Sequence, residues 1–384
     1  MPTQQLRFVF YKDSVVLPID GKQAISFTHQ SLSPSSIQAF YDSALCRPYQ
    51  SLIAALATYK NDKHLDDWLY YQLIRKTAQQ ISPKQAHFNT YTLYKWFLLN
   101  QSGYDARLVI CDTDLLLYVQ SDDHVYDIPF FMQHNKQYVC LNYHDFGSKI
   151  DFEQLHPYAV QIPIPKANQA FSYRVQLLPE FKEEEYTEKQ LRFSYKNKEY
   201  SFKLRVNTEI RNIFANYPVV DFDEYFNIPL SQGTYNSLIP ALKDALQGMK
   251  QQEAIDYLMR FTRYAFAYQN DQISFGKEKR FSPEQTLLYN TSDCDDRAAL
   301  FFSLVKELYQ LPMIVLLYPK HITVAVQLEH SSGEAIVYKN KKYYICEPTP
   351  QAKDLPIGSI DRKLRHSPFE IAFEYNPSQT ILAH

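Results

Sequence analysis

Glycine is scarce in this chain, with only 8 among 384 residues, and neither glycine-rich phosphate-binding pattern, GxGxxG or GxxxxGK[ST], occurs. A dinucleotide or nucleoside triphosphate held by such a loop is therefore not expected. No run of apolar residues approaches the length of about 18 that a membrane-spanning helix needs, so none is predicted. The 40 basic and 42 acidic residues leave a net charge of -2, which predicts neither a nucleic-acid-binding nor a polyanion-binding surface.

Cysteine is also infrequent, and its spacing excludes the common cysteine-based sites. The 5 cysteines are widely separated, odd in number and never arranged as CxxC. They predict neither a disulfide framework nor a structural zinc site, and the scattered histidines form no HExxH motif. We therefore predict no metal and no organic cofactor. Cys46, Cys111, Cys140 and Cys346 lie in apolar or strand-like surroundings, which are typical of buried and unreactive thiols.

What the chain has in abundance is apolar and aromatic side chains. Apolar residues make up 45% of it and aromatic residues 15%, including 31 tyrosines and 25 phenylalanines, while 21% are charged. This is the composition of a globular protein and excludes disorder. The abundance of aromatic residues favours strands and half-buried helices. The length predicts two or three domains.

Several short motifs occur twice, in the same order along the chain. They are LRF at 6–8 and 191–193, YxSLIxAL at 49–56 and 235–242, KQYVC at 136–140 and KYYIC at 342–346, and GSxID at 147–151 and GSID at 358–361. Four matches in register predict a tandem duplication. The growing offset places about 20 additional residues in the second copy, between Tyr268 and Thr291. The basic stretch 277–280 within this insertion is expected to be a solvated face.

Both halves show the same succession of expected elements. Each begins with alternating apolar and polar residues, as half-buried antiparallel strands do, continues with two amphipathic helices and ends with short strands. Residues 157–206 are strand-like with an acidic turn, and the junction is expected there. We predict a first module over residues 1–156, a β-rich middle segment over 157–225 and a second module over 226–384.

Cys294 lies where a helix is predicted to begin. Ser292 and Asp293 precede a run with helical apolar periodicity, as N-cap residues do, so Cys294 becomes the first residue of the helix. Free backbone N–H groups and the positive end of the helix dipole stabilise a thiolate there and lower the pKa of the thiol. The carboxylates of Asp295 and Asp296 oppose this effect, so helix position alone does not decide the reactivity of Cys294.

Two further residues complete a possible triad with Cys294. His321 opens the predicted strand 321–326 and could serve as its base, and Glu347 ends the next strand in the sequence YICEPT. If the two strands pair antiparallel, Glu347 lies beside His321 and fixes its tautomer, as the third member of a triad does.

The segment SDCDDRAALFFSLVKEL, followed by LPMIVLLY, HITVAVQL and YYICEPT, resembles the core of the transglutaminase-like cysteine peptidase superfamily. The resemblance covers roughly residues 235–350, in order, spacing and helix–strand context. It implies that Cys294 is the nucleophile, His321 the general base and Glu347 the orienting acid, where family members more often have Asp. The implied fold class is α+β, with two tandem papain- or transglutaminase-like modules, each preceded by antiparallel strands.

The resemblance also implies an oxyanion hole, because the reaction passes through a tetrahedral intermediate. The backbone N–H of Cys294 is one natural donor. A second donor is expected from the inserted segment, where Gln285 is preferred over Tyr289, Gln269 and Tyr268.

The first half keeps the expected elements but lacks the three chemical groups. Aligned through its helix and strands, it has Phe88 (or Asn89 with a one-residue slip) at the nucleophile position, Asp114 at the base position and Leu141 at the acid position. We therefore predict a catalytically silent module that packs against the second half or shapes its substrate groove.

Two functions of different classes are compatible with these residues. The first is a thiol-dependent amide-bond hydrolase or acyl transferase, acting on a peptide or protein through an acyl-thioester; water as acceptor gives hydrolysis, and an amine gives cross-linking. The second is a catalytically silent scaffold of the same fold that binds a peptide or protein. The N-terminal sequence has no secretory leader, which predicts the cytoplasm, or export if a leader has been removed.

Overall fold

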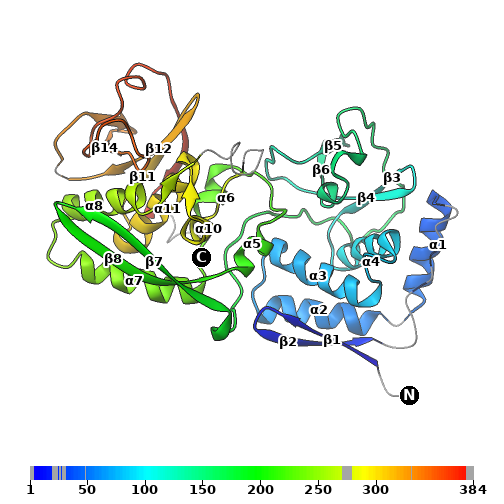
Figure 1. The fold of residues 1–384 in the computed structure, drawn as a ribbon. Helices are drawn as coiled ribbons and strands as arrows, with labels where there is room; N and C mark the ends of the chain where they lie inside the picture. The colour runs from blue at the N-terminus through cyan, green and yellow to red at the C-terminus, as the bar shows by residue number, and fades with distance from the viewer. Residues whose placement is uncertain are drawn as a thin grey trace. The chain divides into compact units, whose positions relative to one another are not determined.

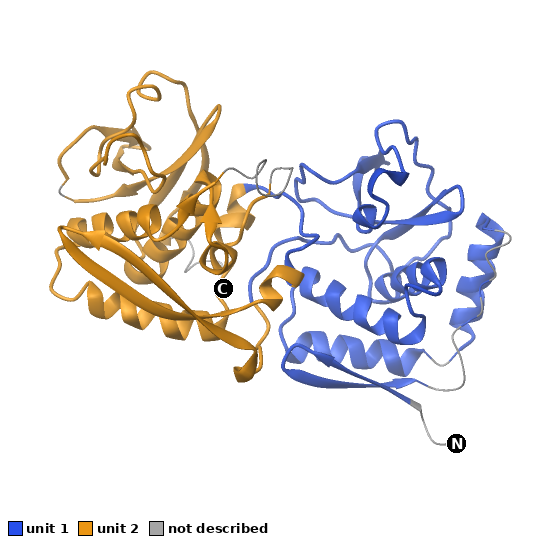
Figure 2. Cartoon of the chain, in the orientation of Figure 1, with its two compact units in different colours: residues 1–177, 213–221 blue, residues 178–212, 222–384 orange. Residues whose placement is uncertain are grey.

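The computed structural model describes residues 4–19, 25, 27, 32–47, 49–269, 279–329 and 331–377 (Figure 1). The chain divides into two compact units: unit 1 contains residues 1–177 and 213–221, and unit 2 contains residues 178–212 and 222–384 (Figure 2). Both units contain helices and antiparallel sheets, so the predicted α+β class is confirmed. The predicted middle segment, 157–225, is not a unit of its own, because its residues are divided between the two units.

Unit 1 consists of a hairpin, a group of helices and a sheet. Its elements are β1 (Gln4–Phe10), β2 (Asp13–Ile19), α1 (Pro34–Leu45), α2 (Gln50–Asp62), α3 (Asp67–Ile81), α4 (Phe88–Gln101), β3 (Ala106–Cys111), β4 (Asp114–Gln120), β5 (Phe130–Gln133), β6 (Lys136–Cys140) and the 3-10 turns η2 (Tyr143–Asp145) and η3 (Gly147–Lys149). The β1–β2 hairpin packs against α2 and α3, and α4 packs against α3 and the sheet.

Unit 2 repeats this succession after the 3-10 turn η4 (Glu183–Glu185). Its elements are β7 (Tyr186–Tyr195), β8 (Lys198–Asn207), α6 (Phe222–Phe226), α7 (Gln232–Ala245), α8 (Gln251–Tyr264), β9 (Ala267–Tyr268), α10 (Pro283–Leu288), β10 (Thr291–Ser292), α11 (Cys294–Tyr309), β11 (Met313–Tyr318), β12 (His321–Gln327), β13 (Ala335–Tyr338), β14 (Lys341–Cys346) and β15 (Glu370–Tyr375), with α5 (Glu209–Ile213) at the boundary between the units. The β7–β8 hairpin packs against α7 and α8, and α11 packs against α8 and β12 (Figure 1).

The two sheets have the same strand order. Unit 1 has the order β3-β4-β6-β5, and unit 2 has β11-β12-β14-β13 with β15 added beside β11. All these pairs are antiparallel, and both hairpins of each sheet close through two-residue turns. The residue pairs that close them are Cys111–Asp114 and Tyr318–His321 in the first hairpins, and Gln133–Lys136 and Tyr338–Lys341 in the second.

Each unit has a central helix that lies against its sheet. In unit 1, α4 is buried at every position from Asn89 to Gln101. In unit 2, α11 is buried from Asp296 to Val305. A helix that is buried on all sides is the core of its domain, so its first residue is held in a fixed place relative to the strands. This position is where Cys294 lies in unit 2.

The connection before the central helix differs between the units. In unit 1, residues 82–87 join α3 directly to α4, whereas in unit 2 the connection from α8 to α11 contains α10 and the short strands β9 and β10. The insertion predicted between Tyr268 and Thr291 therefore lies in this connection. Residues 270–278 within it lie outside the described residues.

The strand-like pattern of residues 157–182 does not produce a strand; the described chain forms only isolated bridges there. Pro163 and Pro165 lack the N–H groups that a ladder requires. The alternation of apolar and polar residues has another cause here. The segment is irregular, but over part of its length every second side chain is buried, as at Phe171 and Tyr173.

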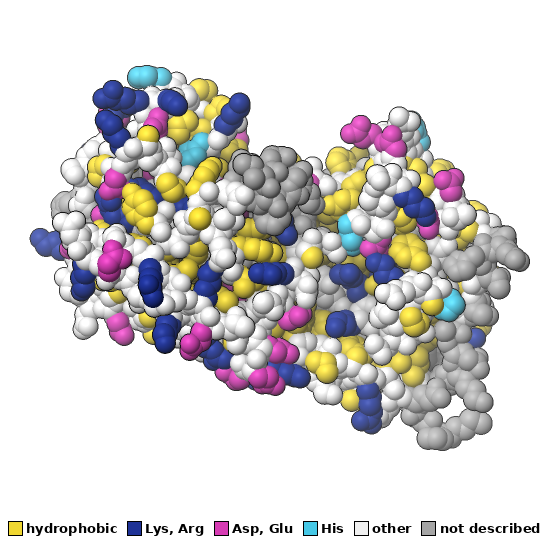
Figure 3. Space-filling model, in the orientation of Figure 1, with side chains coloured by type: hydrophobic (Ala, Val, Ile, Leu, Met, Phe, Trp, Pro, Cys, Tyr) yellow, Lys and Arg dark blue, Asp and Glu magenta, His cyan; other side chains and the backbone are white. Residues whose placement is uncertain are grey.

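The surface charge and the length and polarity of the helices agree with what the composition predicts. Basic and acidic side chains are both scattered over the face shown in Figure 3. Within the described residues, every helix is too short or too polar to cross a membrane.

Candidate active site

The first turn of α11 is fixed by its own side chains, as the sequence predicts. Asp293 is the N-cap, and its Oδ1 accepts hydrogen bonds from the N–H groups of Asp295 (3.1 Å) and Asp296 (3.4 Å). Asp296 completes the capping box by accepting from the N–H of Asp293 at 3.2 Å. These bonds satisfy backbone donors that a helix start leaves free. Cys294 is thereby the first helical residue.

His321 and Glu347 are brought together by the pairing of β12 with β14. The two strands are antiparallel, with Val324 opposite Cys346, which confirms the predicted arrangement. His321 is the first residue of β12, and its Nε2 lies 2.7 Å from the Glu347 Oε2. The other carboxylate oxygen of Glu347 accepts from the N–H of Thr349 at 2.9 Å. Glu347 is 1% exposed, so this contact is formed out of water.

Cys294 lies against the start of the same strand. The backbone N–H of Ile322, the residue after His321, lies close enough to the sulfur to favour its thiolate form. The thiol itself donates to the Asp295 Oδ1 at a sulfur–oxygen distance of 3.3 Å. Nε2 of His321 is engaged by Glu347, which leaves Nδ1 as the ring nitrogen available to another partner.

The thiol of Cys294 does not have the low pKa that a helix start favours. Burial raises its pKa well above the usual value, and the carboxylates of Asp295 and Asp293 raise it further, while the N–H of Ile322 acts in the opposite direction. The second opposing carboxylate is thus Asp293 rather than Asp296, which is turned into the capping box. Desolvation and two negative charges outweigh the helix dipole, so the resting residue is a thiol.

The imidazole of His321 has a raised pKa. Burial alone lowers it, but the hydrogen bond and the charge of Glu347 outweigh burial, and the charges of Asp295 and Asp361 add to them. The site therefore favours a proton on His321. A neutral thiol and an imidazole with raised proton affinity favour proton transfer during attack over a preformed thiolate.

A buried arginine that the sequence analysis did not identify holds the acid in place. Arg263, near the end of α8, is 1% exposed, and its Nε donates to the Glu347 carbonyl oxygen at 3.0 Å. Its Nη2 donates to the carbonyl of Leu355 at 3.1 Å, and its Nη1 pairs with Asp354 at 2.5 Å. Arg263 thus fixes the backbone that carries the Glu347 side chain.

A second buried arginine connects the nucleophile helix to the same place. Arg297, in the first turn of α11, donates through Nη1 to the carbonyl of Arg263 at 2.6 Å and through Nη2 to that of Phe266 at 3.1 Å. Burial lowers the pKa of its guanidinium to about 10. These bonds satisfy carbonyls at the end of α8 and tie that end to the helix of Cys294. The sequence offered one indication of this contact, an arginine three residues after a cysteine at a predicted helix start.

The oxyanion candidates lie in different environments. Gln285, the preferred one, is fully buried in α10, where its Oε1 caps the helix by accepting from the N–H of Ser282 at 3.0 Å. Tyr268 is 52% exposed and pairs with Ser292 through the parallel β9–β10 bridge, next to the start of α11. Gln269 donates its backbone N–H to the Ser292 carbonyl. Tyr289 stacks on Phe281 instead.

The basic stretch 277–280 is not a simple solvated face. Lys277 and Glu278 lie outside the described residues. The side chain of Arg280 is only 17% exposed, pairs with the Asp295 Oδ2 at 3.4 Å and lies over the ring of Phe222, 4.1 Å from its centroid. The arginine is drawn inward by a carboxylate and an aromatic face.

Unit 1 lacks this chemistry at every equivalent position. Phe88 is the first residue of α4, as predicted for the nucleophile position, and packs on Phe146. Asp114 is the first residue of β4 and pairs with Lys149. Counting from the closing pair of each second hairpin, the residue equivalent to Glu347 is Asn142.

The predicted equivalence of Glu347 with Leu141 is therefore one residue too early. The repeated KQYVC and KYYIC motifs align Cys140 with Cys346, whereas the strand register shifts the alignment by one position. Asn142 is fully buried and bonds to the backbone of β4, accepting from the N–H of Leu117 at 2.8 Å and donating to the carbonyl of Leu115 at 3.0 Å.

The other cysteines occupy three kinds of environment. Cys140 and Cys346 are buried, as predicted, Cys111 is partly exposed, and Cys46 is exposed, contrary to the prediction. Burial raises the pKa of Cys140 to about 12. A cysteine of this kind serves packing, because its thiol is shielded from solvent and stays protonated near neutral pH.

The ligand atoms of Asp293, Cys294 and Asp295 lie within 4.8 Å of one another. These groups are already bonded within the protein: Asp293 accepts two backbone hydrogen bonds, and Asp295 binds the thiol and Arg280. The cluster is therefore explained by the helix cap and the ion pair, without a cation.

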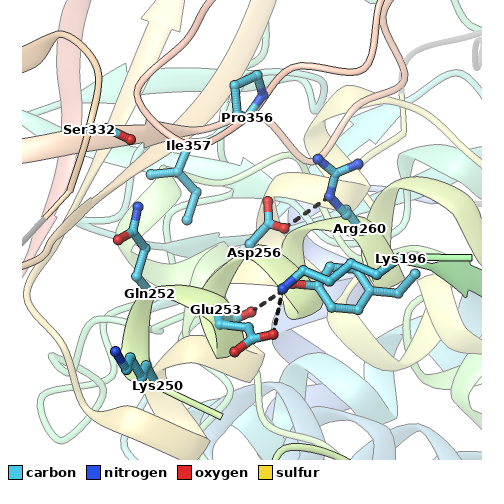
Figure 4. A pocket seen from close by; sticks show the side chains of 10 residues that line it. Lys196, Lys250, Gln252, Glu253, Asp256, Arg260, Ser332, Pro356 and Ile357 are labelled. Atoms are coloured by element: carbon cyan, nitrogen blue, oxygen red, sulfur yellow. Dashed lines mark hydrogen bonds and ion pairs between the residues drawn. The ribbon is translucent and has the colours of Figure 1, made fainter. Parts of the chain in front are cut away.

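A cavity of about 330 Å³ also lies in unit 2 (Figure 4). Four of its charged residues form two ion pairs, Lys196 with Glu253 at 2.5 Å and Arg260 with Asp256 at 3.1 Å. Its lining residues are Tyr195, Lys196, Lys250, Gln252, Glu253, Asp256, Arg260, Ser332, Pro356 and Ile357. None of the three triad residues lines it, so it is separate from the candidate active site.

Comparisons of the chain with protein-family models, with curated proteins and with solved structures gave no match. The functional assignment therefore depends on the geometry of Cys294, His321 and Glu347.

Proposed function

We propose that this protein is a thiol-dependent amide-bond hydrolase or acyl transferase of the transglutaminase-like type, with Cys294 as nucleophile, His321 as general base and Glu347 as orienting acid. The observation that carries the proposal is the 2.7 Å contact between His321 Nε2, on β12, and the buried Glu347; Cys294 begins α11, the helix that packs against β12. In this reading the two units are tandem modules of one type, and unit 1 is catalytically silent.

The reaction begins with the neutral thiol. As the Cys294 sulfur attacks an acyl carbon, Nδ1 of His321 takes the thiol proton, and Glu347 stabilises the imidazolium that forms. The backbone N–H of Cys294, free of a hydrogen-bond partner in the described chain, is a donor for the oxyanion of the tetrahedral intermediate.

Collapse of the intermediate completes acylation. His321 returns the proton to the leaving amine, the carbon–nitrogen bond breaks, and the acyl group stays on sulfur as a thioester. Water attacking the thioester gives hydrolysis, and a primary amine gives a new amide. The substrate class is a peptide or protein amide.

An acyl donor that needs no specific recognition tests this proposal. The full chain is mixed with p-nitrophenyl acetate, p-nitrophenol release is followed in a stopped-flow instrument, and the acetylated residue is located by mass spectrometry. We expect a burst close to one equivalent and a thioester on Cys294, both lost in Cys294→Ala. A burst of equal size in Cys294→Ala would refute the assignment. Adding cadaverine then separates transfer from hydrolysis by its product.

A binding scaffold of the same fold is the second candidate function. The observation that favours it is the raised pKa of the Cys294 thiol, since an active nucleophile more often has a lowered one. A scaffold predicts that alkylation of Cys294 has the rate of an ordinary thiol and is independent of His321.

A further inference from the structure

Unit 1 contains a buried lysine that the scaffold does not require. Lys95, the eighth residue of α4, is 1% exposed. Its Nζ lies over the ring of Tyr91, 4.6 Å from the centroid, and donates no hydrogen bond to any described residue. The eighth residue of α11, the central helix of unit 2, is the fully buried Phe301. The same scaffold therefore accepts an apolar side chain here, and an ammonium without an acceptor is costly to bury.

Other basic side chains lie near Lys95. The charges of Arg75, on α3, and Lys84, before α4, act against its ammonium. The same three cations act against protonation of His144, in η2. Asp145 is the carboxylate that acts on this group, and it is already engaged, because its Oδ1 lies 2.6 Å from Lys84 Nζ and 3.3 Å from His144 Nε2. One carboxylate does not neutralise these cations, so the group has an excess of positive charge.

The buried polar atoms that lack a partner in this group are nitrogens. Gln72, which is 8% exposed, accepts from Arg75 Nη1 at 2.7 Å through its Oε1, but its Nε2 bonds to none of the described residues. Nδ1 of His144 is also buried and has no partner in the described chain. The amide and the ammonium of Lys95 are donors, and Nδ1 becomes one when the imidazole is protonated. Buried donors normally have acceptors, so an acceptor is what this group lacks.

We propose that Lys95, Arg75 and His144 bind a phosphate group at the junction of α3, α4 and η2. The guanidinium and the ammonium groups of Lys84 and Lys95 carry three positive charges against the single negative charge of Asp145, which leaves two for a dianion. The terminal oxygens of phosphate accept charge-assisted hydrogen bonds, which are stronger than neutral ones. The side chains of Lys84 and His144 are 35% and 22% exposed, so the group is open to solvent on their side.

The site belongs to unit 1 and does not depend on the chemistry proposed for unit 2. Counted from the closing pair of each second hairpin, His144 and Asp145 correspond to Thr349 and Pro350, neither of which is charged. At these positions unit 1 has charged side chains that the common scaffold does not need, as it has at Lys95.

Binding of a dianion should be coupled to uptake of a proton. Burial lowers the pKa of Lys95 to about 7; the charges of Asp145 and Cys140 act in the opposite direction, and those of Arg75 and Lys84 add to the effect of burial. Without a ligand the amine is therefore largely neutral at pH 8, and a bound dianion restores its proton. As the pH rises above 7, the affinity should fall by up to about tenfold per pH unit, because the amine must take up a proton.

The other titratable groups that face this site leave the direction of this effect unchanged. Burial and the nearby cations lower the pKa of His144 to about 4, so without a ligand the imidazole is neutral at pH 8. Its protonation on binding adds to the uptake. Burial raises the pKa of the two tyrosines that act on Arg75, so both stay neutral; they are Tyr71 and Tyr91.

Isothermal titration calorimetry of the full chain tests the proposal. Inorganic phosphate, sulfate and acetate are titrated at pH 8 and constant ionic strength, in two buffers whose ionisation enthalpies differ. The difference between the buffers gives the number of protons taken up, and sulfate, which does not titrate in this range, shows that they enter the protein. We expect one phosphate per chain, uptake of about one proton, and acetate binding weaker by about tenfold or more because acetate carries a single charge.

Lys95→Met is the main variant, and Lys76→Met is its control. Lys76 is an exposed residue of α3, next to Arg75, so both variants lose one lysine from unit 1. Lys95→Met should fold, because unit 2 has an apolar residue at this place, and without phosphate its Tm should equal or exceed that of the wild type. It should bind phosphate more weakly by about tenfold or more, with little proton uptake and without the rise in Tm that phosphate gives the wild type. Lys76→Met should behave as the wild type in all three respects.

Absence of saturable phosphate binding to the wild type would overturn the proposal, and so would binding of equal strength in Lys95→Met or with acetate. O-phosphoserine separates the two sources of the ligand. If it binds as tightly as phosphate, the site takes a phosphoryl group carried by a larger molecule, and if it is excluded, the site takes free phosphate; both results support the site. The burst from p-nitrophenyl acetate should be unchanged in Lys95→Met, so failure of the proposed function and failure of this site are distinguishable.

Discussion

Units 1 and 2 share a scaffold and differ in what occupies three of its positions. Both have a hairpin on two helices, a buried central helix and a sheet of the same strand order. At the start of the central helix, unit 1 has Phe88 and unit 2 has Cys294. At the start of the second strand, Asp114 stands in unit 1 where His321 stands in unit 2.

The difference shows that the side chains at these positions make structural contacts in unit 1, whereas the fold of unit 2 does not need such contacts there. In unit 1 they are filled by an aromatic contact, an ion pair and a buried amide, the last being Asn142, which bonds to the neighbouring strand. In unit 2 the side chains of His321 and Glu347 bond to one another, and the thiol of Cys294 bonds to Asp295. Packing of the central helix and register of the strands bring the three positions together in both cases, so the scaffold does not depend on the chemistry.

The largest effect that would sharpen this comparison is expected from His321→Ala. Without the base, acylation of Cys294 by p-nitrophenyl acetate at neutral pH should slow by about 10²- to 10⁴-fold. The matched variant in unit 1, Asp114→Ala, should leave the rate unchanged. Stopped-flow release of p-nitrophenol measures both. Equal rates in wild type and His321→Ala would mean that the two units do not differ in chemistry at this position.

A somewhat smaller effect, on the order of 10- to 1000-fold in kcat, is expected from Glu347→Gln, because an amide cannot stabilise the imidazolium by charge. The pH dependence of this activity has a direction that can be predicted. Glu347 raises the pKa of His321, and the imidazole must be neutral to act as a base. Wild-type activity should therefore rise with pH above the usual histidine range. In Glu347→Gln this rise should move to lower pH. Glu347→Asp, one methylene shorter, should also be impaired. Identical profiles would remove Glu347 from the site.

Substitution of Arg263 tests how the backbone that carries Glu347 is supported in unit 2. Arg263→Met removes donors to the backbone of Glu347 and Leu355 and should lower the free energy of unfolding by about 2 to 4 kcal/mol. It should also lower kcat about tenfold more than it changes KM, because it loosens the acid. Denaturant unfolding and steady-state kinetics measure the two effects. Restoration of kcat by Arg263→Lys supports positioning, and a loss of stability with kcat unchanged contradicts it.

The smallest effect on activity is expected at Asn142, the unit 1 counterpart of Glu347. Asn142→Ala leaves the N–H of Leu117 and the carbonyl of Leu115 without their side-chain partner, and it should cost about 2 to 4 kcal/mol of unfolding free energy. The acylation rate of the folded protein should stay within about twofold. Thermal unfolding and the burst assay check this. A marked loss of rate would show that unit 1 contributes to the chemistry.

Much of the fold could be predicted from sequence periodicity and caps, because these are local. The α+β class, the helix start at Cys294, the strand start at His321 and the antiparallel pairing that brings Glu347 to it all follow from residues near one another in the chain. Of the strand-like stretch 157–206, the part from Tyr186 onward forms β7 and β8, as predicted. Residues 157–182 form no strand, because alternation of buried side chains does not supply hydrogen-bond partners, which depend on a neighbouring strand.

The residue types at helix and strand ends could be read from the amino-acid sequence, because capping and periodicity act within a few positions. The electrostatics of these residues depend on contacts between elements. Burial and the carboxylates of Asp293 and Asp295 raise the pKa of Cys294, and Arg280, in the segment before α10, pairs with Asp295 in the first turn of α11. The one-residue shift from Leu141 to Asn142 likewise needed the strand register. Desolvation and charge–charge energies depend on distances between elements, and local sequence patterns do not specify those distances.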